Sequence, residues 1–331
     1  SDRMSATFVK YLIDAYGPST FNDLYEQSHD YNLRAQLAAV YGKSVNELEA
    51  GWRTYVDTVT IRFPQLVQET ERAEAVMDFD RMREFAEGML EKSERQVDSM
   101  FSLSNLKQAY FYAGNYYAAT EAAQRHAAIE DRSARNWMSL AAFQMMNGEY
   151  APARENLLQA QALDPADQAV TFNLALNSLY TGDTARAESL LVEIISKPEE
   201  RSPQGESRIV LGEIYRLKGS KALRERAVTY FQEAMQVFQQ QLQSTPSVST
   251  AYLWFGAAAL GFGDTDAARS SLETALFLES RPFYVGIVNL WLGKTADVIG
   301  DHETADGYYG RVVAGASAAY TQQEAAPLSE H

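Results

Sequence analysis

The sequence contains no cysteine and only four histidines in 331 residues. Without cysteine, disulfides, thiolate catalysis and cysteine-ligated metal centres are excluded. The four histidines, His29, His126, His302 and His331, are scattered, and none forms an i, i+4 pair around a glutamate as in catalytic zinc helices. We therefore predict a chain with no metal, no cofactor and no enzymatic activity of its own.

Long hydrophobic runs and an excess of basic residues are also missing. The longest uncharged apolar stretch, Ala251 to Gly263, is too short to span a bilayer, so we expect no membrane insertion. The 29 basic residues are outnumbered by 44 acidic ones, and the net charge of −15 has the wrong sign for binding nucleic acid. We interpret the acidic surface as a solvated one, with a dedicated site for a basic partner as the alternative.

The most informative feature that is present is a repeat, because Gly114, Gly148 and Gly182 recur every 34 residues. One unit contains, in order, Trp137, Leu140, Ala141, Gly148, Tyr150, Ala153, Leu157, Ala160 and Pro165. This order and spacing resemble the tetratricopeptide repeat (TPR), a helix-turn-helix unit of 34 residues. The resemblance implies an all-α solenoid, because one such unit cannot bury its apolar stripe without neighbours.

Six units are predicted, and they span residues 100–133, 134–167, 168–201, 205–241, 249–282 and 286–319. In the fourth unit three extra residues fall within Ser220 to Arg226, which predicts a lengthened turn between its helices. Glycines at mid-helix positions, Gly212, Gly256 and Gly293, predict close helix contacts. The tail at residues 320–331 is short for a capping helix, so we expect the apolar edge of the sixth unit to allow self-association.

Residues 1–63 lack the repeat and predict a small bundle of four helices at about 4–16, 19–28, 31–41 and 44–59. Ser44 followed by Glu47 is a capping box at the start of the last helix. The segments FVKYLIDAYGP at residues 8–18 and YGKSVNELEAGW at residues 41–52 resemble the C-terminal helical tail of the gluzincin-like peptidase MA family.

That resemblance implies a larger protein. In the peptidase family the His-Glu-x-x-His zinc helix and the further glutamate ligand precede this tail, so they would lie before Ser1. No residue of the present sequence matches them, and no metal ligand is carried over. We therefore expect a fragment of a bacterial protein with an upstream zinc peptidase-like domain. The resemblance favours an extracytoplasmic or cell-surface location over the cytoplasm.

The segment between bundle and repeats, residues 64–99, predicts two amphipathic helices at 66–77 and 81–97. One interpretation is a degenerate repeat that has lost its glycine. The other is a connecting pair whose charged face caps the first strict repeat. Both interpretations remain open from the sequence.

The resemblance to TPR arrays also predicts a binding groove, since the first helix of each unit lines the concave face of such arrays. The corresponding positions are Phe111, Tyr112, Met138, Met145, Met146, Phe172, Leu176, Leu179, Tyr180, Glu213 and Arg216, with Lys294 and Asp297 at the charged end. Methionine and aromatic side chains suit an apolar helix or extended peptide. We therefore predict a non-catalytic scaffold that binds a protein or peptide partner in this groove.

Three alternatives to this groove remain. Its residues could pack on neighbouring helices, or the N-terminal region or C-terminal tail could fill it. A different function, resembling that of glycan-binding helical proteins of the cell surface, would need exposed aromatic residues arranged as a platform.

His126 occupies a repeat position that usually holds alanine, and we expect it to be a buried, hydrogen-bonded structural residue.

Overall fold

The structure is a computed structural model that describes residues 6–28, 32–59, 63–197 and 202–329. Within these ranges the chain is helical and contains no strand. No helix in the described part is long and apolar enough to cross a membrane. Met4 and Tyr31, where two predicted helices begin, and residues 198–201 of the third predicted repeat lie outside the described residues.

The first four helices form the predicted small bundle. They are α1 (Ala6–Tyr16), α2 (Pro18–Gln27), α3 (Leu33–Tyr41) and α4 (Val45–Val59). Their common core contains Tyr11, Leu12, Leu24, Leu37, Tyr41 and Leu48. The predicted capping box is confirmed, because the Ser44 amide donates to Glu47 Oε2 at 2.8 Å and the Glu47 amide donates to Ser44 Oγ at 3.2 Å.

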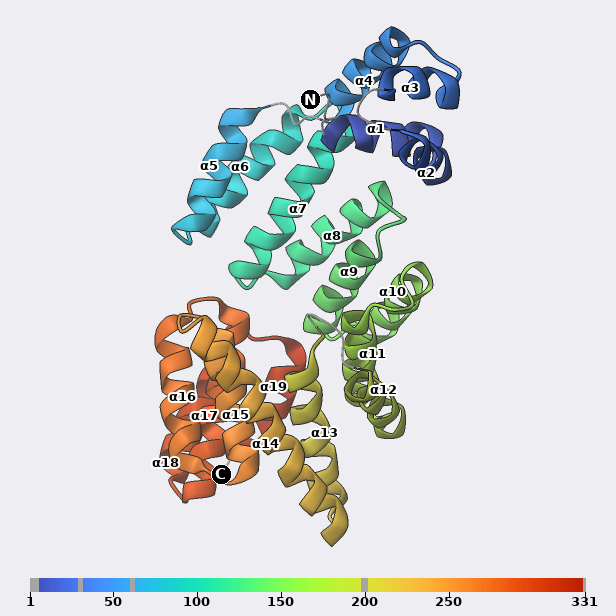
Figure 1. Ribbon diagram of the computed structural model, residues 1–331. Coiled ribbons are helices and arrows are strands. Elements are labelled where there is room, and N and C mark those ends of the chain that lie inside the picture. The colour runs from blue at the N-terminus through green and yellow to red at the C-terminus, as the bar shows by residue number, and fades with distance from the viewer. Residues whose placement is uncertain (1–5, 29–31, 60–62, 198–201, 330–331) are drawn as a thin grey trace.

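The rest of the chain is a succession of helix pairs that curves through space (Figure 1). The pairs are α5 (Pro64–Ala75) with α6 (Phe79–Lys92), α7 (Gln96–Tyr112) with α8 (Tyr116–Ile129), α9 (Ala134–Met146) with α10 (Tyr150–Leu163), α11 (Gln168–Tyr180) with α12 (Thr184–Ser196), α13 (Gln204–Lys218) with α14 (Lys221–Ser244), α15 (Ser249–Phe262) with α16 (Thr265–Leu278), and α17 (Pro282–Ile299) with α18 (His302–Ala314). Each helix packs on its sequence neighbours, so the predicted all-α solenoid is confirmed.

Close helix approach explains the mid-helix glycines. A methyl group on Gly212 would lie 2.8 Å from the ring of Phe231, and one on Gly256 would lie 2.6 Å from Leu272. These distances are too short for any other residue without a shift of the neighbouring helix. The predicted contacts at these two glycines are therefore confirmed.

The pair α5 and α6 has the same turn as the repeats, although it lacks the glycine. Met77 takes a left-handed backbone with φ of 56°, where Gly114 in the next pair has φ of 76°. The Met77 amide donates to the Glu74 carbonyl at 2.9 Å, and the next amide donates to the Ala73 carbonyl at 2.8 Å. This is the hydrogen-bond pattern that ends α7 as well. The turn geometry favours the interpretation of residues 64–99 as a degenerate repeat.

Two sequence-based boundaries are wrong. The turn of the fourth unit is short, since α13 ends at Lys218 and α14 begins at Lys221. The extra residues lengthen α14 instead, which has 24 residues, because Ser220 caps its start by accepting from the Leu223 amide. The helix predicted at 81–97 ends at Lys92, where the chain becomes extended at Ser93, and the following helix begins at Gln96.

The C-terminal tail forms a helix, contrary to the expectation that it is too short to cap the array. α19 (Ala319–Ala325), followed by a 3-10 turn (Ala326–Leu328), packs on α17 and α18. It also contacts α9, while α17 contacts α7, so the C-terminal elements return to the second and third pairs of the array (Figure 1). Self-association through the sixth unit stays a prediction, with Val298 and Val313 still exposed beside the tail.

Candidate functional site

The first helices of five pairs and the C-terminal helix surround one internal cavity. Side chains from α9, α11, α13, α15 and α17 line it, and α19 forms a further wall. Its volume is about 780 Å³, which lies within the range of pockets that enclose small ligands. Its lining comes from residues between 142 and 324, so the cavity depends on the return of the C-terminal elements.

Seven of the predicted groove residues line this cavity, namely Met145, Met146, Phe172, Leu176, Leu179, Tyr180 and Glu213. They lie on three successive first helices, α9, α11 and α13, as the repeat positions predict. Met145 is also buried in the core formed by α9, α10 and α11, and Met146 in the core between α8 and α9. Phe172 and Leu179 are half-buried and pack against the main core, so the apolar wall is continuous with it.

Two predicted groove residues of α7 are used in packing instead. The ring of Phe111 lies 5.7 Å from Phe143 and 5.4 Å from Phe283 on α17. The ring of Tyr112 lies 4.8 Å from Phe79, and the Arg281 guanidinium lies over its other side at 5.6 Å. Because α17 returns to α7, this part of the predicted groove is filled by the protein itself.

The remaining predicted positions also lie outside the cavity lining. Met138 is half-buried against the core between α9 and α10. Arg216 forms an exposed ion pair with Glu213 at 2.7 Å. Asp297 accepts a hydrogen bond from Tyr309 Oη at 2.7 Å, which directs it towards α18. Lys294, in contrast, lines the cavity.

A stack of tyrosine rings holds α19 against the inner face. Tyr320 stacks on Tyr180 with ring centroids 4.6 Å apart and an interplanar angle of 16°, and Tyr180 stacks in turn on Tyr150 at 5.9 Å. Burial raises the pKa of Tyr320 well above its ordinary value, so this phenol stays protonated at neutral pH. The C-terminal tail therefore fills part of the predicted groove, which is one of the alternatives left open by the sequence.

A second contact fixes the segment before α19. Tyr116 Oη donates to the carbonyl of Ala316 at 2.7 Å. A methyl group on Gly114 would lie 2.8 Å from Cβ of Ala316, so the turn of the first repeat and the C-terminal segment touch. The C-terminal segment is thus held against the first repeat by backbone and aromatic contacts between residues about 200 positions apart.

The charged groups of the cavity differ in whether they have an ion-pair partner. Glu213 is paired with Arg216, and Glu324 accepts from Lys294 Nζ at 2.5 Å. Glu206, in the first turn of α13, has no side-chain partner among the described residues. Burial raises the pKa of the Glu206 carboxyl, because a carboxylate loses hydration there. A hydrogen bond from the Glu206 backbone amide opposes part of this rise, so the carboxyl group has a backbone donor but no cationic side-chain partner among the described residues.

The sequence interpretation missed several lining residues, which are Glu206, Ile209, Trp254, Tyr284, Ile287, Leu290, Trp291 and Tyr320. The repeat positions that identified Glu213 also contain Glu206 and Ile209 in the same helix, so the signal for these two was present. Tyr320 follows the last unit and has no repeat position. Its place could be known only from the three-dimensional return of the chain.

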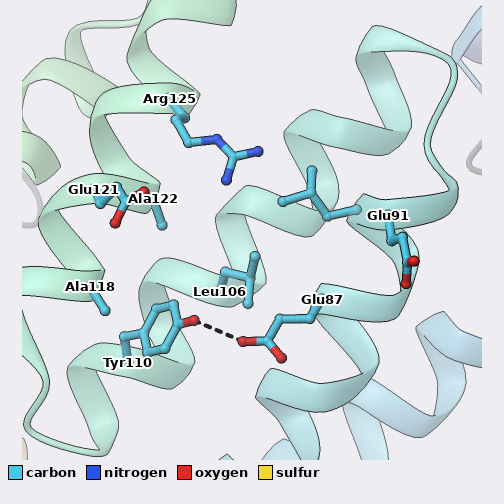
Figure 2. Close-up of a pocket in the computed structure, with 9 residues that line it drawn as sticks. Glu87, Glu91, Leu106, Tyr110, Ala118, Glu121, Ala122 and Arg125 are labelled. Carbon is cyan, nitrogen blue, oxygen red and sulfur yellow. Dashed lines mark hydrogen bonds between the residues drawn. The ribbon is translucent and has the colours of Figure 1, made fainter.

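A second, smaller hollow of about 420 Å³ lies between three consecutive helices, α6, α7 and α8. Figure 2 shows Glu87 facing Tyr110, whose Oη donates to Glu87 Oε1 at 2.9 Å, and Arg125 reaching into the same space from α8. Burial, and then the bond to Glu87, raise the pKa of Tyr110. Ala118 and Ala122 leave room between these polar side chains. No pattern in the sequence indicated this hollow.

Among the described residues no group of three or more histidine, aspartate or glutamate side chains could hold a metal ion. His29 and His331 lie outside the described residues. The expectation for His126 is confirmed, since it is 6% exposed and its Nδ1 lies 3.2 Å from Lys107 Nζ. The lysine donates, so the ring nitrogen accepts. Burial, and then the Lys107 charge, lower the pKa of His126 to about 4.

Comparison with known proteins identifies related folds but no family. No family model and no curated protein matches the sequence. The chain is similar to a solved TPR protein of Parabacteroides merdae, at 15% identity over 81% of this chain and 97% of that one, with a TM-score of 0.49. A thermophilic TPR protein of Thermus thermophilus is 21% identical over 59% of this chain and 98% of that one, with a TM-score of 0.43. The fold itself rests on the helix pairs and turns described above.

Proposed function

We propose that this protein is a scaffold that binds an apolar segment of a protein partner in the internal cavity. The observation that carries the proposal is the apolar lining contributed by the first helices of successive repeats, with Met145, Met146, Phe172 and Leu176 on one wall. Thioether side chains adapt to different apolar shapes, and aromatic rings bury large areas at low entropic cost.

The size of the cavity limits what enters it. A volume of about 780 Å³ accommodates a short extended segment rather than a long helix. Burial of an apolar side chain contributes roughly 1.5–3 kcal/mol, and ordering the segment offsets part of this. Two or three buried side chains therefore give an affinity in about the micromolar range or weaker. Such an affinity suits a scaffold that releases its partner.

Display of a random peptide library on phage, selected against the full chain, tests the proposal. Selected peptides are synthesised with a fluorophore and titrated by fluorescence polarisation. Phe172→Ser and Leu217→Ser should each weaken binding about tenfold, because both side chains line the cavity. Leu217 is 77% exposed, so its substitution leaves the core intact.

The matched control is Phe277→Ser, since Phe277 is 88% exposed on α16 and does not line the cavity. It should leave the affinity unchanged. Equal binding by all three variants and the unaltered chain would place the peptide site elsewhere and remove the proposal.

The N-terminal bundle extends the proposal. Its resemblance to a peptidase tail supports a larger bacterial, extracytoplasmic protein in which the scaffold holds a partner beside a zinc peptidase-like domain. Reading the gene upstream of the codon for Ser1 tests this part. A His-Glu-x-x-His motif is expected there, and its absence would remove the peptidase association while leaving the binding proposal in place.

A second candidate function, binding of a small ligand or glycan at the cell surface, is favoured by the cavity volume. The aromatic rings argue for the peptide, because Tyr150, Tyr180 and Tyr320 stack on one another and their faces are not free as a platform. Binding of an oligosaccharide panel with loss in Trp254→Ala would favour the second candidate.

A further inference from the structure

Glu206 distinguishes the internal cavity from an ordinary apolar groove. It lies in the first turn of α13, and the cavity lining also includes Thr250 near the start of α15 and Tyr284 near the start of α17. Burial is the main cause that raises the pKa of the Tyr284 phenol, and the Glu206 charge makes the smallest of several contributions, which places the two groups near each other. One end of the cavity therefore combines a carboxyl group with an aromatic ring.

Two basic groups of the α17 segment, Arg281 and Lys294, are bound to other carboxylates. Arg281 lies over the Tyr284 ring at 4.4 Å, but its guanidinium binds Glu279 through bonds of 2.8 Å and 2.6 Å. Lys294 binds Glu324 and lies over the Trp291 ring at 4.3 Å. In the lining, three glutamates face one lysine. Of the three, Glu206 alone has no cation supplied by the described part of the chain.

An isolated carboxyl group in a partly desolvated site is costly unless a partner of opposite charge arrives. A cation that enters the cavity would gain a charge-assisted hydrogen bond, and aromatic faces nearby add a cation–π attraction. The apolar walls require that the rest of the ligand be hydrophobic. These three requirements describe a single chemical class of ligand.

We propose that the cavity recognises an apolar peptide segment carrying one lysine or arginine side chain, whose charged end binds Glu206 while its neighbours fill the pocket lined by Phe172, Leu176 and Trp254. This inference rests on the proposed function and specifies the partner. Leu217 and Gln323 line the cavity and are both exposed to solvent, so the remainder of a polypeptide can leave beside them. The overall charge of −15 attracts a basic segment over longer distances.

The test uses acetylated and amidated pentapeptides with leucine or phenylalanine at the outer positions and one of three central residues, lysine, Nε-acetyllysine or glutamate. Acetylation removes the charge and retains the stem. Titration of the full chain should show the lysine peptides binding at least about tenfold more tightly than the acetyllysine peptides. The glutamate peptides should bind most weakly.

The variant Glu206→Gln should abolish the preference for lysine, bringing the lysine and acetyllysine peptides to equal affinity. The matched control Glu155→Gln removes one exposed carboxylate from α10, so it changes the net charge equally and should preserve the preference. The comparison of peptides on the unaltered chain does not depend on the folding of either variant.

The outcomes separate the two proposals. Equal binding of lysine and acetyllysine peptides, with loss in Phe172→Ser, would overturn the role of Glu206 and retain the scaffold function. A lysine preference that persists in Glu206→Gln would also overturn it, since the cation would then bind elsewhere. Failure of every peptide to bind would overturn both proposals.

Discussion

The two hollows of the molecule are built in opposite ways. The outer hollow lies between α6, α7 and α8, which follow one another in sequence, and its polar groups include the bonded pair Tyr110 and Glu87. The inner cavity is walled by helices from five pairs and closed by α19. One of its carboxyl groups, on Glu206, has no cationic side-chain partner in the described chain.

The difference shows where function can be located in such an array. A hollow between consecutive helices is formed by the repeat itself and is as stable as its local packing. A cavity between distant repeats requires contacts that span the whole array, and these contacts are separable from those within each repeat.

The largest effect is expected for Tyr320→Ala. Loss of the ring stacked on Tyr180 removes a buried aromatic contact and should lower the free energy of unfolding by about 3 kcal/mol. Hydrogen exchange should increase in α9, α11 and α19 more than in α6, because the closure is lost before the repeats unfold. Urea unfolding followed by circular dichroism gives the free energy.

Tyr117→Ala is the control, since Tyr117 is 71% exposed on α8 and its removal should change stability by less than about 0.5 kcal/mol. If Tyr320→Ala were equally harmless, the C-terminal helix would not hold the cavity closed.

The next effect concerns pH and the helices that wall the outer hollow. His126 on α8 has a pKa lowered to about 4 from an ordinary value of 6.5. Between these values the unfolded chain binds the extra proton, so stability should decrease as the pH falls from about 6.5 to about 4, by up to about 3 kcal/mol. Above about pH 6.5 the contribution is constant.

His126→Gln should flatten the stability profile over this range, because the amide oxygen still accepts from Lys107 and does not titrate. His302→Gln serves as a control, since the His302 side chain is 68% exposed. A profile for His126→Gln with the same slope as the unaltered chain would assign the acid sensitivity to other groups.

A smaller, stabilising effect is expected at the turn that positions α6, one wall of the outer hollow. Met77 holds a left-handed φ of 56°, which costs about 1 kcal/mol for a residue with a Cβ atom. Met77→Gly should therefore raise the free energy of unfolding by about 1 kcal/mol. Met77→Ala keeps the strain and should bring no gain, so equal effects of both substitutions would argue against the repeat-like turn.

The smallest effect is expected inside the outer hollow. Tyr110→Phe removes the bond to Glu87 and should cost about 0.5 kcal/mol, because the exposed glutamate is rehydrated. A double-mutant cycle with Glu87→Gln measures the coupling directly. A coupling of several kcal/mol would show that the bond between Tyr110 and Glu87 stabilises the outer hollow more than is expected for an exposed hydrogen bond.

The repeat period predicted most of the helical architecture, because small residues such as Gly212 and left-handed turns such as that at Gly114 are local requirements. It also assigned Met145 and Tyr180 to the predicted groove, and both side chains line the cavity. It failed at the fourth unit, where the sequence does not distinguish a longer turn from a longer α14. It missed Met77, because methionine is not a residue expected in a left-handed turn.

The closure of the cavity was beyond sequence reasoning for a different reason. The stacking of Tyr320 on Tyr180 depends on the accumulated curvature of several repeats, and no local pattern encodes it. The same curvature brings Phe283 against Phe111 and so removes part of the predicted groove. The residues on the inner face of a solenoid can be predicted from the repeat positions. The residues that close its cavity can be identified only from the three-dimensional shape of the array.

The nine methionines of the chain provide the most direct test of the internal cavity as the binding site. Methyl NMR of methionine-labelled protein, titrated with the lysine-containing apolar peptide, reports on Met145 and Met146 in the cavity wall and on Met77 and Met89 outside it. We predict saturable shifts of Met145 and Met146 with Met77 and Met89 unchanged. Saturable shifts of Met77 or Met89, with Met145 and Met146 unmoved, would contradict the account.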